Sequence, residues 1–162
     1  MDREAIITGK KILIVDDEPD VLDTLEDLLS MCEVHKASDF ASAKALLESD
    51  SFDMAILDIM GVKGYDLLDI CAARNITAVM LTAYALTPED VKKSYSKGAA
   101  YFLPKEELVN ITSFLADILE AQARGKSTWE GWYNRLASFC ERKFGPDWQT
   151  KDKQFWDRFP FY

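Results

Sequence analysis

Five short apolar runs, each followed by a stretch with helical periodicity, restrict how this chain can fold more than any other feature. Runs of this length, rich in β-branched residues and bounded by polar residues or glycine, predict buried strands. Between them, apolar residues recur every three or four positions, as on one face of an amphipathic helix. This alternation predicts an α/β fold with a parallel sheet covered by helices on both faces. The predicted strands lie at residues 11–15, 32–36, within 51–60, 77–81 and 100–103.

Polar residues stand at the ends of four of these runs. Asp16 and Asp17 follow the first, Asp58 lies near the end of the third, Thr82 follows the fourth and Lys105 comes soon after the fifth. Parallel strands end at the same edge of a sheet, which is where open α/β sheets bind their ligands. We therefore expect these five side chains to converge, although an acid at a strand end can also do no more than cap a turn or face water.

Such a set of residues suits phosphoryl transfer. Neighbouring carboxylates repel each other unless a lysine or a hard cation neutralises them, and Mg²⁺ prefers oxygen ligands. A carboxylate that the metal leaves free could attack phosphorus in line. Lys105 would offer a positive charge to a phosphoryl oxygen, and the Thr82 hydroxyl a hydrogen bond.

Four segments, KILIVDDEPD, FDMAILDIM, AVMLTA and GAAYFLPK, occur on alternating elements in the order found in one known family. Through them, residues 10–122 resemble the receiver domain of two-component response regulators, a CheY-like superfamily that includes the single-domain chemotaxis regulators. The resemblance implies a flavodoxin-like, doubly wound fold whose five-stranded parallel sheet has the order 2-1-3-4-5. It also implies a role in phosphorelay signal transduction rather than conventional enzyme activity.

The resemblance assigns a role to each of the acids. Asp58 matches the aspartate that a histidine kinase phosphorylates. Asp17 resembles the direct Mg²⁺ ligand, with Asp58 and the backbone carbonyl of Met60 completing the protein's share, and Asp16 resembles an acid that helps to hold the metal. The implied partners are a sensor histidine kinase or a histidine phosphotransfer protein, and a downstream protein target that the sequence does not identify.

The resemblance also identifies residues that respond to the phosphoryl group. Thr82 corresponds to the switch hydroxyl, Lys105 to the lysine that pairs with the phosphoryl group, and Phe102 to the aromatic switch position. Met60 and Tyr84 occupy the two positions that control the access of water in the family. We therefore expect both side chains to slow the hydrolysis of an acyl phosphate.

Two stretches depart from the family pattern. The glycine after the phosphorylated aspartate is reached at Gly64, six residues after Asp58, which is earlier than usual and makes the loop short. The usual lysine–proline pair is absent, since Pro104 precedes Lys105 and Glu106 follows it. The short loop affects the place of the third metal ligand, the backbone carbonyl of Met60. Because no proline follows Lys105, a cis peptide bond after this lysine, usual in the family, would be displaced or lost.

Two other functions remain open on the sequence. A pseudo-receiver, which binds partners without accepting phosphate, could keep the same acids. The haloacid-dehalogenase-like phosphatases also use an aspartate nucleophile beside Mg²⁺. They need a second acid two residues after the nucleophile, however, and this chain has Met60 at that place.

Charge and aromatic content change together near Gly125. The net charge is −9, and residues 1–124 hold 12 basic and 23 acidic residues, whereas residues 125–162 hold 7 and 5. All four tryptophans lie in the second part. We therefore predict a receiver domain at residues 1–124 and an aromatic-rich helical extension at 125–162. Ser127 would cap its first helix, and Gly145 with Pro146 would end that helix.

The predicted extension carries eleven aromatic residues, which cannot all face water. It either folds back on the receiver as additional core or forms an output or dimerisation surface, and in the second case phosphorylation would alter its packing. A second short helix is expected from Asp147, with Trp148 and Phe159 among its aromatic residues.

Composition restricts the partners and the location. The acidic net charge disfavours binding to a phosphate backbone, so we expect no nucleic-acid partner. No apolar run approaches the length of a membrane span, so we expect no membrane partner. The sequence predicts a cytoplasmic protein that acts through protein contacts, with a homodimer as one option.

Overall fold

A parallel sheet of five strands forms the centre of the computed structural model, which describes residues 3–83, 87–147 and 153–156. Its order is β2-β1-β3-β4-β5, and all four neighbouring pairs are parallel. The predicted α/β fold and strand order are therefore confirmed. The strands are β1 (Lys11–Val15), β2 (Glu33–Ala37), β3 (Met54–Asp58), β4 (Thr77–Thr82) and β5 (Tyr101–Pro104).

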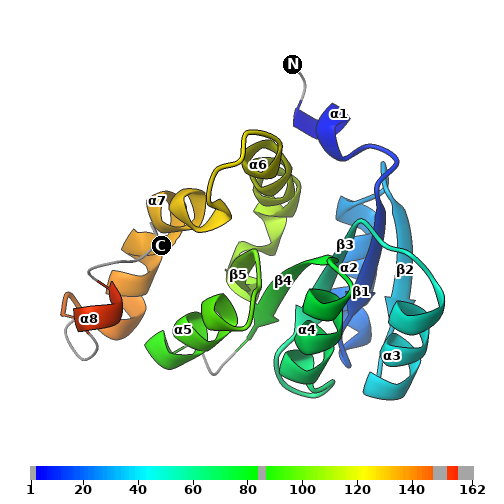
Figure 1. Ribbon diagram of the computed structural model, residues 1–162, viewed down its shortest axis with the longest axis horizontal. Helices are drawn as coiled ribbons and strands as arrows, with labels where there is room; N and C mark the ends of the chain where they lie inside the picture. The colour runs from blue at the N-terminus through cyan, green and yellow to red at the C-terminus, as the bar shows by residue number, and fades with distance from the viewer. Residues whose placement is uncertain (1–2, 84–86, 148–152, 157–162) are drawn as a thin grey trace.

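Helices cover both faces of this sheet (Figure 1). Helices α3, α4 and α5 lie side by side over one face, and α2 and α6 lie over the other. In the described part of the chain, none of the helices is both long and apolar enough to cross a membrane. The helices that follow the strands are α2 (Pro19–Leu28), α3 (Phe40–Ser49), α4 (Gly64–Ala73), α5 (Pro88–Ser96) and α6 (Ile111–Ala123).

The central strands bury even their charged ends. All five residues of β3 are buried, including Asp58, and β1 is buried from Ile12 to Val15. In a parallel sheet covered on both faces the strands are apolar throughout, so polar side chains gather where the chain leaves the sheet. Because β1 and β4 pair with β3 on either side, the backbone of Asp58 is held at a fixed depth.

Two parts of the chain differ from the sequence prediction. The segment predicted as one helix from Glu106 to residue 123 begins as a 3-10 helix, η1 (Lys105–Asn110), and becomes α-helical at Ile111. A 3-10 helix rises more per residue than an α-helix, so η1 carries the chain from the sheet edge to α6 in few residues. The pattern also did not predict α1 (Arg3–Ile7), which forms because Ile7 is buried where α1 packs on α6.

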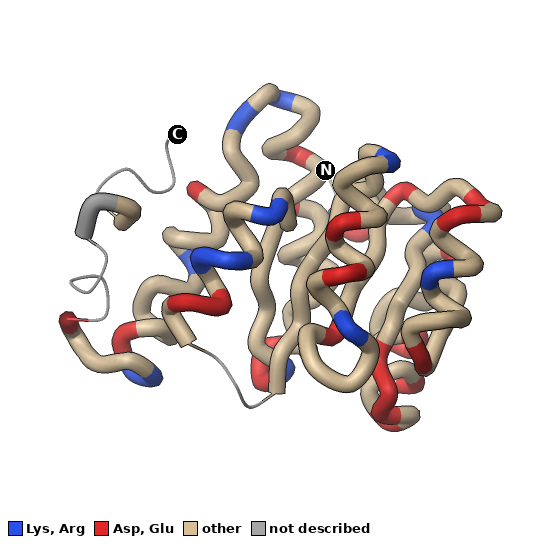
Figure 2. Tube along the Cα trace, turned by 60° about the horizontal axis from the view of Figure 1, so that its bottom comes forward, with Lys and Arg blue, Asp and Glu red and all other residues tan. Residues whose placement is uncertain are grey.

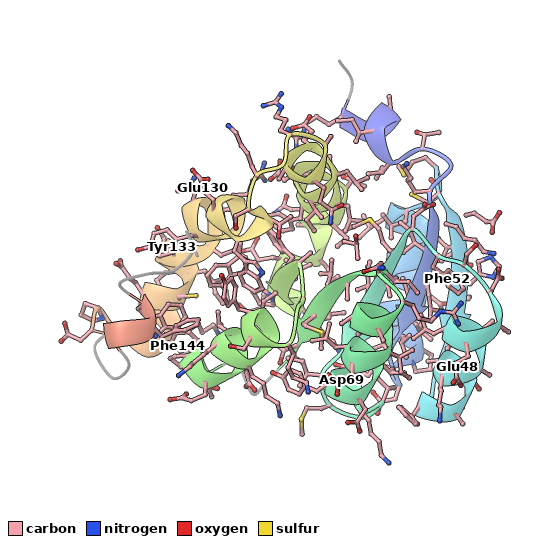
Figure 3. All side chains as sticks on the ribbon, in the orientation of Figure 1. Glu48, Phe52, Asp69, Glu130, Tyr133 and Phe144 are labelled. Carbon is pink, nitrogen blue, oxygen red and sulfur yellow. The ribbon has the colours of Figure 1, made fainter. Side chains whose placement is uncertain are left out.

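The aromatic extension packs on the sheet edge. It contains α7 (Thr128–Phe144) and α8 (Lys153–Trp156), and α7 contacts both α6 and β5. As predicted, Ser127 caps α7 by accepting a hydrogen bond from the Trp129 N–H at 3.2 Å, and the helix ends before Gly145, whose φ is 91°. Ring side chains fill the space between α5 and α7, with Phe144 near α8 (Figure 3). Trp148 and Phe159 lie outside the described residues.

Asp117 on α6 connects both ends of the chain. Its carboxylate accepts a hydrogen bond from Arg3 of α1 and pairs with Arg135 of α7, with 2.7 Å between Oδ2 and Nε. The Asp117 side chain is only 19% exposed, whereas the two arginines are more open to solvent. One carboxylate therefore helps to hold α1 and α7 on the same helix.

We expect Asp117→Asn to loosen α1 and α7, because the neutral amide keeps the shape of the side chain but loses two ion pairs. The free energy of unfolding should fall by about 1 kcal/mol. Amide hydrogen exchange should become faster in α1 and α7 and stay unchanged in α3. Asp69→Asn, which removes the α4 pair with Lys97, is the matched control and should leave α1 and α7 unaffected. Equal effects of the two variants would contradict this role of Asp117.

Candidate functional site

Acidic residues meet at the carboxyl edge of the sheet. Asp16 follows β1 directly and is fully buried, Asp58 closes β3 and is 4% exposed, and Asp17 and Glu18 are exposed beside them. The Oδ1 of Asp16 accepts a hydrogen bond from the Glu18 N–H at 2.9 Å, which folds the chain back at this point. Figure 2 turns this edge toward the viewer and shows acidic segments gathered along it.

Lys105 brings a positive charge to these acids. Its Nζ lies 2.8 Å from Asp16 Oδ2, 3.0 Å from Glu18 Oε1 and 3.5 Å from Asp58 Oδ1. The lysine follows β5 directly and its side chain is 12% exposed. One ammonium group is therefore shared by three carboxylates, and Asp58 is the most distant of the three.

Burial changes how readily these groups ionise. Desolvation, followed by the nearby charge of Asp16, raises the pKa of Asp58 to about 7. Desolvation also raises the pKa of Asp16, although Lys105 acts against it. Burial disfavours the charged form of Lys105, but its hydrogen bonds to Asp16 and Glu18 and the nearby charges of Asp58 and Asp16 together outweigh that effect and raise its pKa. The site thus holds more negative charge than one lysine can neutralise, which favours a cation.

The short loop after Asp58 closes tightly over the site. The Ile59 N–H donates to Leu81 O at 3.0 Å, and the Val62 N–H donates to Met60 O at 2.6 Å. Gly61 has a φ of +68°, and a Cβ there would lie 2.5 Å from Asp17 Oδ2. The backbone of this short loop at Gly61 therefore lies directly against the Asp17 carboxylate. Met60 O already accepts one hydrogen bond, which leaves its second lone pair for a metal.

The residues around this edge form a cleft of about 320 Å³. Four residues that the sequence predicted contribute to it, namely Asp17, Asp58, Met60 and Lys105. Buried Asp16 stands behind them and pairs with Lys105. The cleft is lined by Asp17, Glu18, Asp58, Met60, Gly61, Ala83 and Lys105.

Other predicted site residues are placed differently. Thr82 and Phe102 are buried in β4 and β5, and neither lines the cleft. Among the described residues, the Thr82 hydroxyl has no hydrogen-bond partner. The Met60 side chain is 63% exposed, and Tyr84, predicted to limit water access with it, lies outside the described residues. Glu18 was missed as a site residue, although it follows the two aspartates directly in the sequence.

The donor atoms suit a hard divalent cation. Carboxylate oxygens of Asp16, Asp17 and Glu18 lie within 4.8 Å of one another, and Asp58 faces the same cleft. Mg²⁺ prefers oxygen ligands and keeps several waters, and an open cleft of this size has room for them. The residues present therefore fit the ion that the sequence predicts.

Comparison with known proteins decides the family. Residues 12–115 match the sequence model of the response regulator receiver domain. The chain belongs to this receiver domain family. Residues of the two-component response regulator ARR18 of Arabidopsis thaliana are 34% identical over 113 positions, which cover 64% of this chain and 18% of that protein. This chain thus matches less than a fifth of the length of that relative.

Solved receiver structures have the same fold. The CheY-like response regulator receiver domain protein of Methanospirillum hungatei JF-1 is 28% identical, with a TM-score of 0.61, and the match covers 71% of this chain and 99% of that one. A two-component response regulator of Clostridium difficile, 21% identical with a TM-score of 0.64, covers 70% and 98% and supports the fold alone. Helix α7 lies beyond the matched receiver residues.

Gly64 should tolerate no side chain, because a Cβ there would overlap the backbone oxygen of Asp58. We expect Gly64→Ala to lower the free energy of unfolding by about 2–4 kcal/mol. Gly131→Ala is the control, since Gly131 also lies in a helix but a Cβ there would meet nothing within 4 Å. That change should stabilise the protein by about 0.5–1 kcal/mol. Denaturant unfolding measures both, and a neutral Gly64→Ala would contradict the close approach.

Asp58 should make stability depend on pH in the presence of a metal chelator. Its pKa is raised from 3.8 to about 7, so the folded state binds the proton more tightly than the unfolded state, and stability falls as pH rises from about 4 to about 7. Asp58→Asn removes this loss. The variant should exceed wild type by about 2–4 kcal/mol near pH 8 and match it near pH 4.

Urea unfolding across this pH range measures the difference. Glu48→Gln on α3 removes an exposed acid and should follow the wild-type pH profile. A constant gap between wild type and Asp58→Asn at every pH would contradict the shifted pKa of Asp58.

Proposed function

We propose that this receiver domain accepts a phosphoryl group on Asp58, from a histidine kinase or a histidine phosphotransfer protein, with Mg²⁺. The observation that carries the proposal is the single buried carboxylate at the end of β3, with Lys105 3.5 Å away and an acidic cluster beside it. Buried charge of this kind is costly for a fold and is typical of functional sites.

The reaction begins with an ionised Asp58. One of its oxygens attacks phosphorus while the bond from phosphorus to the imidazole nitrogen of the donor breaks, and the electron pair leaves with the imidazole. An acyl phosphate on Asp58 results. Because the pKa of Asp58 is about 7, positive charge nearby is needed to keep this oxygen deprotonated at neutral pH.

The acidic residues and Lys105 would have different electrostatic roles: the acids would bind the metal, and Lys105 would pair with the phosphoryl group. Asp17, Asp58 and the backbone carbonyl of Met60 would hold Mg²⁺, with Asp16 supporting from behind. The ion, when bound, neutralises phosphoryl oxygens during transfer. Lys105 would move from Glu18 and Asp16 toward the phosphoryl group, and the buried Thr82 hydroxyl, which lacks a partner among the described residues, would donate a hydrogen bond to it.

The proposed domain bounds, location and downstream partner follow from the receiver assignment and from the sequence. Residues 1–124 are proposed as the receiver and 125–162 as an extension without enzymatic activity, in a cytoplasmic protein that signals to a downstream protein target. A pseudo-receiver is the alternative that the tight Lys105 pairs with Asp16 and Glu18 keep open. A haloacid-dehalogenase-like phosphatase would need a second acid two residues after Asp58. Met60 stands at that position, which disfavours this alternative.

Mass spectrometry after treatment with acetyl phosphate and Mg²⁺ tests the proposal. Wild type should gain one phosphoryl group, whereas Asp58→Asn, or wild type with a chelator, should gain none. Asp20→Asn is the control, because Asp20 belongs to the same acidic stretch but does not line the cleft. It should be phosphorylated as wild type is. Absence of labelling in folded wild type would favour the pseudo-receiver.

A further inference from the structure

Two indole groups anchor helix α7, one on β5 and one on the chain just before that strand. The Nε1–H of Trp129 donates to Ala99 O at 2.7 Å, and that of Trp132 donates to Phe102 O at 2.6 Å. Both tryptophans are almost fully buried. A buried indole N–H is costly unless it finds an acceptor, so these bonds fix how α7 lies against β5 and the residues just before it.

Helix α7 also contacts the segment that follows β5. Lys143 Nζ lies 3.0 Å from Glu106 Oε1 on η1. Both side chains are about half exposed, so this ion pair is weak on its own. Because buried Trp132 already holds α7 on β5, this ion pair gives the same helix a second contact, on η1.

Lys105 therefore lies between two points that α7 holds. Phe102, whose carbonyl binds Trp132, precedes it by three residues, and Glu106, which binds Lys143, follows it directly. The Lys105 ammonium lies among three carboxylates at distances of 2.8, 3.0 and 3.5 Å. A small shift of this backbone would change which of the three it can reach.

We propose that α7 is a positioning element for Lys105, with Trp132 as the main positioning residue, and that its docking favours the acceptance of a phosphoryl group at Asp58. The inference rests on the proposed function of Asp58. When α7 is docked, the junction of β5 and η1 holds Lys105 within reach of Asp58. When the junction is loose, Lys105 remains on Asp16 and Glu18, whose oxygens are nearer.

The coupling is reciprocal, because binding at one site and docking at another must affect each other by the same factor. A phosphoryl analogue on Asp58 that draws Lys105 toward it should therefore strengthen the docking of α7. Helix α7 would then report the state of the cleft, although none of its residues lines the cleft.

Calorimetric titration of Trp132→Phe with Mg²⁺, and then with beryllofluoride in excess Mg²⁺, tests the proposal. We expect the affinity for beryllofluoride to fall by about fivefold or more and that for Mg²⁺ to change by less than about twofold. A merely structural loss would move both affinities together. Trp129→Phe is the matched control, since it loses the same indole donor on the same helix, but its acceptor lies six residues before Lys105. Its beryllofluoride affinity should stay within about twofold of wild type.

Lys143→Gln tests the same link without disturbing the buried indoles. It should weaken beryllofluoride binding slightly, whereas Arg142→Gln, which removes the neighbouring charge from α7, should not. Both residues lie over the Phe139 ring, so the two variants differ chiefly in the pair with Glu106. Amide hydrogen exchange of residues 128–144 in wild type should slow on addition of beryllofluoride, and in Asp58→Asn it should not.

The outcomes separate two failures. If wild type does not bind beryllofluoride, the proposed function is wrong and this inference is overturned with it. If wild type binds but Trp132→Phe and Trp129→Phe behave alike, or α7 exchange does not slow, the phosphoacceptor role stands and the positioning role of α7 is overturned. Tighter binding by Trp132→Phe would overturn it as well.

Discussion

Two carboxylates buried at the end of a parallel sheet are the constraint on which this site depends. Asp16 and Asp58 are both nearly inaccessible to water, and like charges in such surroundings are strongly unfavourable without a counter-charge. Lys105, which directly follows the edge strand β5, supplies one positive charge. Because one charge cannot neutralise two aspartates and Glu18, the site favours a cation. Burial, followed by the nearby charge of Asp16, raises the pKa of Asp58.

The sequence predicted the parts of the site that depend on topology. Short apolar runs predicted the strands that lead to Asp16, Asp58 and Lys105, and parallel connectivity alone brings the ends of those strands to one edge. Parts that depend on side-chain geometry were out of reach. That Glu18 shares Lys105, or that Gly61 lies against Asp17, follows from the turn after β1 and the shortened loop, which periodicity does not describe.

Helices α1 and α7 illustrate the same limit. Helix α7 was predictable from its aromatic spacing and its Ser127 cap, since both are local signals. Its place on the molecule was not, because a buried indole must find an acceptor but nothing local says that the acceptor is Phe102 O. Helix α1 is too short to show a period, and it forms only because Ile7 and Arg3 find partners on α6.

The packing of α7 on β5 concerns both the place of this helix and the geometry of the site. As an edge strand, β5 is the natural place for a second chain to add, and α7 occupies that side of the sheet with an apolar face that must be buried somewhere. Burial alone would be satisfied by many docking geometries. The contacts at Phe102 and Glu106 select one in which α7 holds the chain before and after Lys105. Helix α7, which stabilises the fold by covering β5, is therefore also placed to act on Lys105, whose charge three carboxylates share.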